Sequence, residues 1–151
     1  VAGAGAGAAL AALVFVAVSI NIERILEYEG LPERALETVL TLLVVVLVSI
    51  VSLIPGQSNT ALGLELFGIA LVFSLVIGRL SNQRLPPGAE PRRWRLSRMG
   101  VRAIAAVPLL VGGLSVLAET GGGLYWIVAG LIGAIVGAVA NAWVLLVEIL
   151  R

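Results

Sequence analysis

The sequence contains no cysteine, histidine, lysine or aspartate among its 151 residues. It therefore offers no disulfide, no thiolate or imidazole ligand for a metal ion, and no histidine or cysteine to ligate haem. Ser/His/Asp and Cys/His nucleophilic sites are excluded, and so is a lysine Schiff base. These absences favour a protein that is not an enzyme, and no cofactor is expected.

Charge is also scarce. Only 13% of the residues are charged and 60% are hydrophobic, and the mean hydropathy is +1.09. Soluble domains carry about a quarter charged residues, and a water-soluble core of this size has no room for so much apolar surface. The solvent is therefore expected to be lipid. The net charge of +1 gives no reason to expect a nucleic-acid partner.

The sequence consists mainly of long apolar runs. A bilayer core needs about 20 apolar residues per helix. The runs predict a single transmembrane domain over residues 1–151, an all-α bundle of about five transmembrane helices with spans at about 2–21, 35–54, 60–80, 101–117 and 124–150. A short polar helix is predicted over 22–29, stopped by Gly30, with Pro32 opening the next helix.

The ten arginines are distributed on one side of this pattern. When the connections between spans are numbered in chain order, every arginine lies in or beside the first connection, the third connection or the C-terminal end. Their positions are 24, 34, 79, 84, 92, 93, 95, 98, 102 and 151. The two other connections, Pro55 to Thr60 and Glu119 to Gly123, contain no basic residue. This positive-inside pattern predicts an outside N-terminus and a cytoplasmic C-terminus in a multi-pass protein of a bacterial inner membrane. The first run lacks a basic start and a cleavage site, so we interpret it as a span rather than a signal peptide.

Small residues form ridges on two spans. One ridge consists of Gly3, Gly7 and Ala11, and the other of Ala129, Gly133, Gly137 and Asn141. In lipid, such ridges let helix backbones approach closely, and an amide such as that of Asn141 needs a partner. The ridges are a helix-packing interface, either within one subunit or between subunits. Because burying both within five helices is hard to arrange, we expect one of them to face another subunit.

Glu65 lies well inside a hydrophobic run, near the expected outer face. An acidic residue within the membrane is a candidate ion or proton site. The alternative is structural: the carboxylate reaches outer water or accepts a hydrogen bond from Ser58, Asn59 or Thr60.

Charge is separated between the two inner connections. The first carries glutamates, including Glu23, Glu27, Glu33 and Glu37, and the second carries Arg95, Arg98 and Arg102 at helical spacing. Cations are disfavoured at the start of a helix. At least one of these arginines is therefore expected to contact one of the glutamates or an anionic lipid headgroup, unless the arginines serve only to set the topology.

Two stretches carry a resemblance. AALAALVFVAVSINIERILE, residues 8–27, and LIPGQSNTALGLELFGIAL, residues 53–71, resemble segments of small, uncharacterised multi-spanning proteins of high-GC bacteria. The resemblance implies a habitat and a multi-pass fold but no catalytic or binding residue.

Two functions from different classes remain open. The first is a non-enzymatic membrane subunit that assembles with itself or with a larger complex, through small-residue helix faces and charged cytoplasmic loops. The second is a homo-oligomeric ion channel or small transporter with Glu65 near its outer mouth. An intramembrane enzyme ranks third, because no paired carboxylates lie at matching depth.

Overall fold

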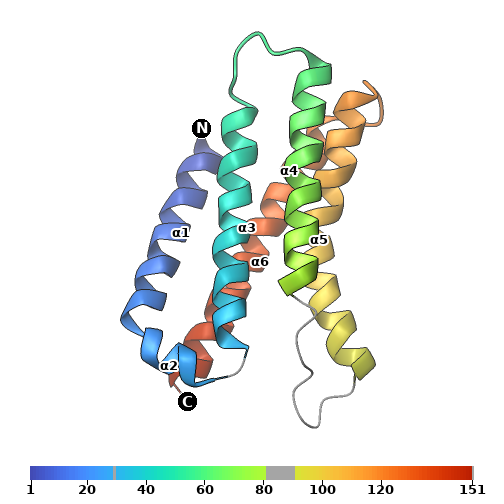
Figure 1. Ribbon diagram of the computed structural model, residues 1–151. Helices are drawn as coiled ribbons and strands as arrows, with labels where there is room; N and C mark the ends of the chain where they lie inside the picture. Colours follow the sequence, from blue (N-terminus) through green and yellow to red (C-terminus); the bar gives the residue numbers. More distant parts are fainter. Residues whose placement is uncertain (29, 81–90, 151) are drawn as a thin grey trace.

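The structure is a computed structural model that describes residues 1–28, 30–80 and 91–150, and all of the described secondary structure is helical. Its elements are α1 (Ala2–Ile20), α2 (Ile22–Glu27), α3 (Leu31–Val51), α4 (Asn59–Leu80), α5 (Pro91–Leu117) and α6 (Leu124–Leu150) (Figure 1). Among the described residues, four helices are long and apolar enough to cross a membrane: α1, α3, α4 and residues Leu124–Val147 of α6. By length and composition these are the helices of a membrane protein.

The five long helices form a bundle in which consecutive helices run in opposite directions (Figure 1). The connections 52–58 and 118–123 therefore lie at the same end, which we call the turn end. Asn59 Nδ2 donates a hydrogen bond of 3.3 Å to Glu119 Oε1 there, joining the two connections. The opposite end, which we call the arginine end, contains α2, the start of α3, the end of α4, the start of α5 and the end of α6.

The fifth span expected from the sequence, 101–117, forms the second part of α5. This helix is 27 residues long, and the segment Arg102–Leu117 within it is apolar. The helix continues through Pro108.

Three boundaries differ from those expected. The polar helix ends at Glu27 rather than at residue 29. Gly30 is the N-cap of α3, with φ of 88°, instead of the stop of α2, and Pro32 is the second residue of α3 rather than the first. Glycine suits this place because it adopts positive φ without steric cost. The second span ends at Val51, three residues early, because the backbone of Ser52–Ile54 already turns.

Serine side chains organise both connections of the turn end. Ser58 Oγ accepts a hydrogen bond of 3.2 Å from Ala61 N–H and so caps the start of α4. Ser115 Oγ accepts from Gly123 N–H at 2.8 Å and donates to the Thr120 carbonyl. Positive φ at Glu119 and at Gly121, Gly122 and Gly123 lets the chain reverse within this short connection.

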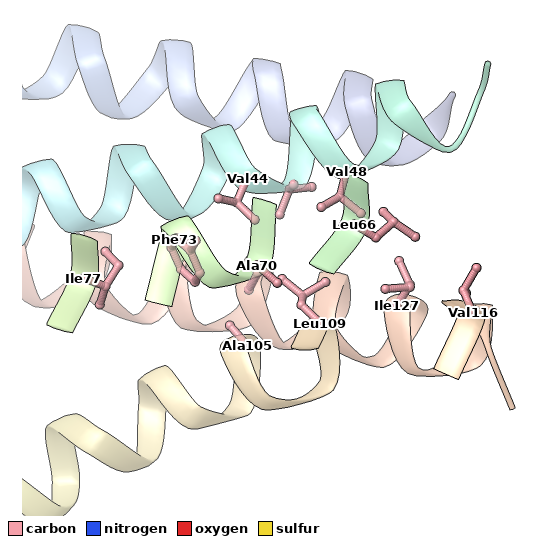
Figure 2. Close-up of a cluster of buried hydrophobic side chains, with 12 residues drawn as sticks. Val44, Val48, Leu66, Ala70, Phe73, Ile77, Ala105, Leu109, Val116 and Ile127 are labelled. Carbon is pink, nitrogen blue, oxygen red and sulfur yellow. The ribbon is translucent and has the colours of Figure 1, made fainter. Parts of the chain in front are cut away.

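The main core lies between α3, α4, α5 and α6. Figure 2 shows its buried side chains, which come from all four helices. The members named in the figure are Val44, Val48, Leu66, Ala70, Phe73, Ile77, Ala105, Leu109, Val116 and Ile127. A smaller cluster at the arginine end joins α2, α3 and α6 through Ile25, Leu31, Ala35 and Leu145. Helix α1 contributes no buried side chain larger than Gly7.

Candidate functional site

The most polar place in the interior is a junction of α3 and α5. Arg102 Nε donates to Glu37 Oε1 at 2.5 Å and Arg102 Nη2 donates to Glu37 Oε2 at 2.8 Å. The two side chains are only 15% and 8% exposed. The guanidinium fork matches both carboxylate oxygens, which is the strongest geometry for such a pair. Arg102 is thus one of the three arginines for which a glutamate contact was expected, and it meets Glu37.

The surroundings of the pair are small and partly polar. Thr41 Oγ1, one turn after Glu37, donates to the Glu37 carbonyl at 2.7 Å. Asn141 of α6 lines the same small cavity as Glu37, Thr41 and Arg102, with a volume of about 20 Å³. A cavity needs about 10–15 Å³ to hold a water molecule, so this one admits a single water between the pair and Asn141.

The chemistry available at this junction is electrostatic. The two charges neutralise each other at this contact between α3 and α5. Among the described residues there is no group of three or more acidic side chains that could hold a metal ion. The pair fixes α3 to α5, and removing Glu37 would leave the Arg102 guanidinium buried without this counter-ion.

The other inner charges fall into two groups. Glu23 and Glu27 are exposed on α2, and Glu33 is half-buried, with an Oε2 atom that is enclosed and accepts no hydrogen bond within the described part of the chain. The backbone of Arg95 and Arg98 belongs to α5, but their side chains lie outside what the structure describes.

Glu65 lies in the second turn of α4, at the turn end, and its side chain is exposed. Its Oε2 accepts a hydrogen bond from Gln57 Nε2, a residue of the preceding connection. The structural alternative expected either contact with water or a hydrogen bond from Ser58, Asn59 or Thr60. The side chain is exposed, but its hydrogen-bond partner is Gln57, because Ser58 caps the helix and Asn59 reaches Glu119.

The two small-residue ridges pack inside the chain. A side chain at Gly3 would meet Ser49 Oγ at 2.6 Å, and one at Gly7 would meet Val45 and Val46 at 3.1 Å. A side chain at Gly133 would meet the Ile104 carbonyl oxygen at 2.6 Å. Helix α3 therefore covers Gly3 and Gly7 of the first ridge, and α5 covers Gly133 of the second.

The expectation that one of these ridges faces another subunit was therefore wrong for Gly3, Gly7 and Gly133. Within the second ridge, Gly137 and Asn141 are half-buried and Ala129 is exposed. The physical reason is that the two ridges meet different helices, α3 and α5, so they do not compete for one internal partner.

Four further glycines, Gly63, Gly112, Gly113 and Gly130, also lie at close contacts between helices. A Cβ at Gly63 would lie 2.7 Å from Leu117 N, and one at Gly113 would lie 2.6 Å from Phe67 N. Gly112 and Gly130 likewise face Ile127 and Leu109 across the contact of α5 with α6. A signal was present, since Gly112-Gly113 and Gly130 lie in apolar spans, but without the helix pairing it does not say which neighbour they meet.

One face of α1 is left uncovered. Gly5, Ala9, Ala12 and Val16 follow one another at helical spacing and are all exposed, and nothing lies within 4 Å of a side chain placed at Gly5. The opposite face, with Gly3 and Gly7, packs on α3, which is the main neighbour of α1. The helix thus presents a second small-residue strip, here called the open α1 face, that the chain itself does not use.

No protein-family model, no curated protein and no solved structure matches this chain. The geometry of its own residues is what bears on function.

Proposed function

We propose that the chain is a non-enzymatic integral membrane subunit that assembles with itself or with a larger membrane complex through the open α1 face. The supporting observation is the one-sided packing of α1, a helix apolar enough to span a bilayer with only Gly7 buried. In lipid, apolar side chains gain little from leaving the solvent, so close backbone approach at small residues drives helix association. Gly5 and Ala9 offer such an approach to a helix outside the chain.

The proposed setting is a bacterial inner membrane, with five spans, an outside N-terminus and a cytoplasmic arginine end. The fifth span is the apolar part of α5, whose arginine-rich start continues past the bilayer. The one-sided arginines support this orientation. Cysteines placed at Ser58 and at Ser81 test it, since the chain has none of its own. Labelling of Ser58→Cys alone by an impermeant reagent applied from outside supports it, and labelling of Ser81→Cys alone contradicts it.

The channel or transporter alternative gains less support from the geometry. Glu65 is exposed at the turn end, Ser74 Oγ donates to the Ala70 carbonyl of its own helix at 2.7 Å, and Asn141 lies beside the Glu37–Arg102 pair. These three polar groups do not share one axis within the chain.

Cysteine cross-linking in membranes tests the assembly. Ala9→Cys and Ala12→Cys place thiols on the open α1 face, and Ala140→Cys is the matched control on an exposed position of α6. We expect oxidative dimers from the first two variants and none from the control, if the chain assembles with itself. If a different protein binds the face, both α1 thiols should instead be protected from a lipid-soluble maleimide. Free labelling of both thiols without dimers would contradict the proposal.

A further inference from the structure

An apolar groove separates α1 from the second half of α6. Its floor is built from Ile25, Leu42 and Leu145, which are at most 5% exposed. The walls come from residues of α1 between Leu10 and Asn21 and residues of α6 between Ala138 and Leu146. In Figure 1 the lower part of α6 passes behind α3 towards α2. The groove is distinct from the open α1 face, which lies on another side of the same helix.

The length of the groove matches one leaflet of a bilayer. From Leu10 to Asn21 the helix rises about 16 Å, at 1.5 Å per residue. Half of a hydrocarbon core measures about 15 Å. Asn21 lies at one end, where the polar helix α2 begins, and a polar helix of this kind belongs at the boundary between lipid and water. The groove therefore starts at that boundary and runs to the middle of the membrane.

The volume of the groove is large enough for a lipid chain. It is about 350 Å³, whereas a cavity needs only about 10–15 Å³ to hold one water molecule. A groove of this length and volume has room for one extended acyl chain.

The chemistry of the walls agrees with the size. Every lining residue is apolar except Asn21, and the Asn21 side-chain Nδ2 already donates to the Ala17 carbonyl at 2.9 Å. The Trp143 indole is the one other lining side chain that carries a polar atom, so the wall is almost entirely hydrocarbon up to the Asn21 end. There α2 carries both signs of charge on exposed side chains, with Glu23 and Glu27 beside Arg24.

We propose that this groove is a binding site for one acyl chain of a membrane phospholipid, whose headgroup lies beside Asn21 and α2. The bound chain fills the space that α1 and α6 leave open and replaces the helix contact that is missing there. It occupies one defined place on the molecule, in contrast to the lipids that exchange freely around any membrane protein.

Trp143 supplies a spectroscopic reporter because it lines the groove. In a Trp94→Phe/Trp126→Phe background it is the sole tryptophan, and bromine atoms on an acyl chain quench a neighbouring indole. The probe is dibrominated phosphatidylcholine, a zwitterionic lipid chosen because α2 carries both signs of charge. It is titrated into protein that has been stripped of lipid in mild detergent.

Two double variants distinguish the effect of blocking the groove from the effect of adding aromatic rings to the protein surface. Ala17→Phe/Ala142→Phe places two rings in the groove, and Ala8→Phe/Ala140→Phe places the same two rings on exposed positions of the same helices outside it. We expect saturable quenching at a single lipid per chain in the parent and in the control, reversed by unbrominated lipid. In the groove variant the saturable phase should disappear, and native mass spectrometry should show loss of the retained phospholipid.

Two results would contradict the proposed lipid site. Quenching that rises in proportion to added lipid, without saturation, in the parent would show only freely exchanging lipid and overturn the proposal. Equal saturable quenching in both double variants would place the lipid elsewhere and also overturn it. A thermal melt of each variant checks folding, and the single variant Ala17→Phe repeats the test if the double variant unfolds. Because the readout is lipid binding, it does not depend on whether the chain assembles through the open α1 face.

Discussion

Helices α5 and α1 are held in opposite ways. Helix α5 is enclosed between α4 and α6, and glycines on all three helices bring backbones against it, as at Gly63, Gly113 and Gly133. Helix α1 packs mainly on α3, touches α6 only slightly and leaves Gly5 without a neighbour. Both are rich in small residues, so composition does not separate them. What separates them is whether another helix of the same chain covers each small face.

The largest effect is expected where α5 is tied to α3 by charge. Glu37→Gln leaves the Arg102 guanidinium buried without its counter-ion, and breaking such a pair from one side costs about 3–5 kcal/mol. The midpoint of denaturant unfolding in detergent measures this loss. Replacing both partners, as Glu37→Leu/Arg102→Met, should cost less than either single change. A double variant that is less stable than both single variants would show that the pair is not acting as a mutually neutralising unit.

Glycines on α5 and on α1 allow a steric comparison of the two helices. Gly113→Leu pushes a side chain into the backbone of Phe67, where a Cβ alone would already lie 2.6 Å from the nitrogen. Over-packing of this kind costs about 1–3 kcal/mol. Gly5→Leu is the matched change on α1, with open space around it, and its effect on the unfolding midpoint should be within about 0.5 kcal/mol. Equal losses at the two sites would mean that α1 is as enclosed as α5.

The connection between α5 and α6 gives a third prediction about the packing around α5. Ser115→Ala removes the acceptor for Gly123 N–H and the donor to the Thr120 carbonyl. The expected loss is about 1 kcal/mol, the net value of a hydrogen bond that water can partly replace. Thermal unfolding in detergent measures it, with Ser52→Ala as the control, because Ser52 Oγ bonds only the Val48 carbonyl of its own helix. A larger loss in the control would contradict the role given to Ser115.

The smallest effect is expected at Glu65. Its side chain is exposed and bonds Gln57, whereas Glu37 is buried, so Glu65→Gln should leave the melting temperature unchanged where Glu37→Gln lowers it. A cation-dependent or proton-dependent flux through reconstituted vesicles that Glu65→Gln abolishes would contradict the assembly account and favour the channel.

Part of this structure follows from the sequence and part does not. The all-helical fold and the contact of one of the three arginines with a glutamate rest on local patterns or on charge, and the structure contains both, the second as Arg102 with Glu37. The partners of the small ridges do not follow from the sequence, because small-residue spacing specifies a close approach without specifying the neighbour. Gly3 and Gly133 are covered for that reason, while Gly5, two residues from Gly3, is open.

The central claim is that the bundle is complete except at the open α1 face, and the mass of the assembly in mild detergent tests it most directly. Native mass spectrometry should show wild-type chains in a complex, with themselves or with another subunit. Gly5→Leu and Ala9→Leu should give monomers that melt at the wild-type temperature, because a bulky side chain blocks close backbone approach without making the helix less apolar. A wild-type chain that is monomeric at every protein concentration and in every detergent, with no bound partner, would contradict the claim.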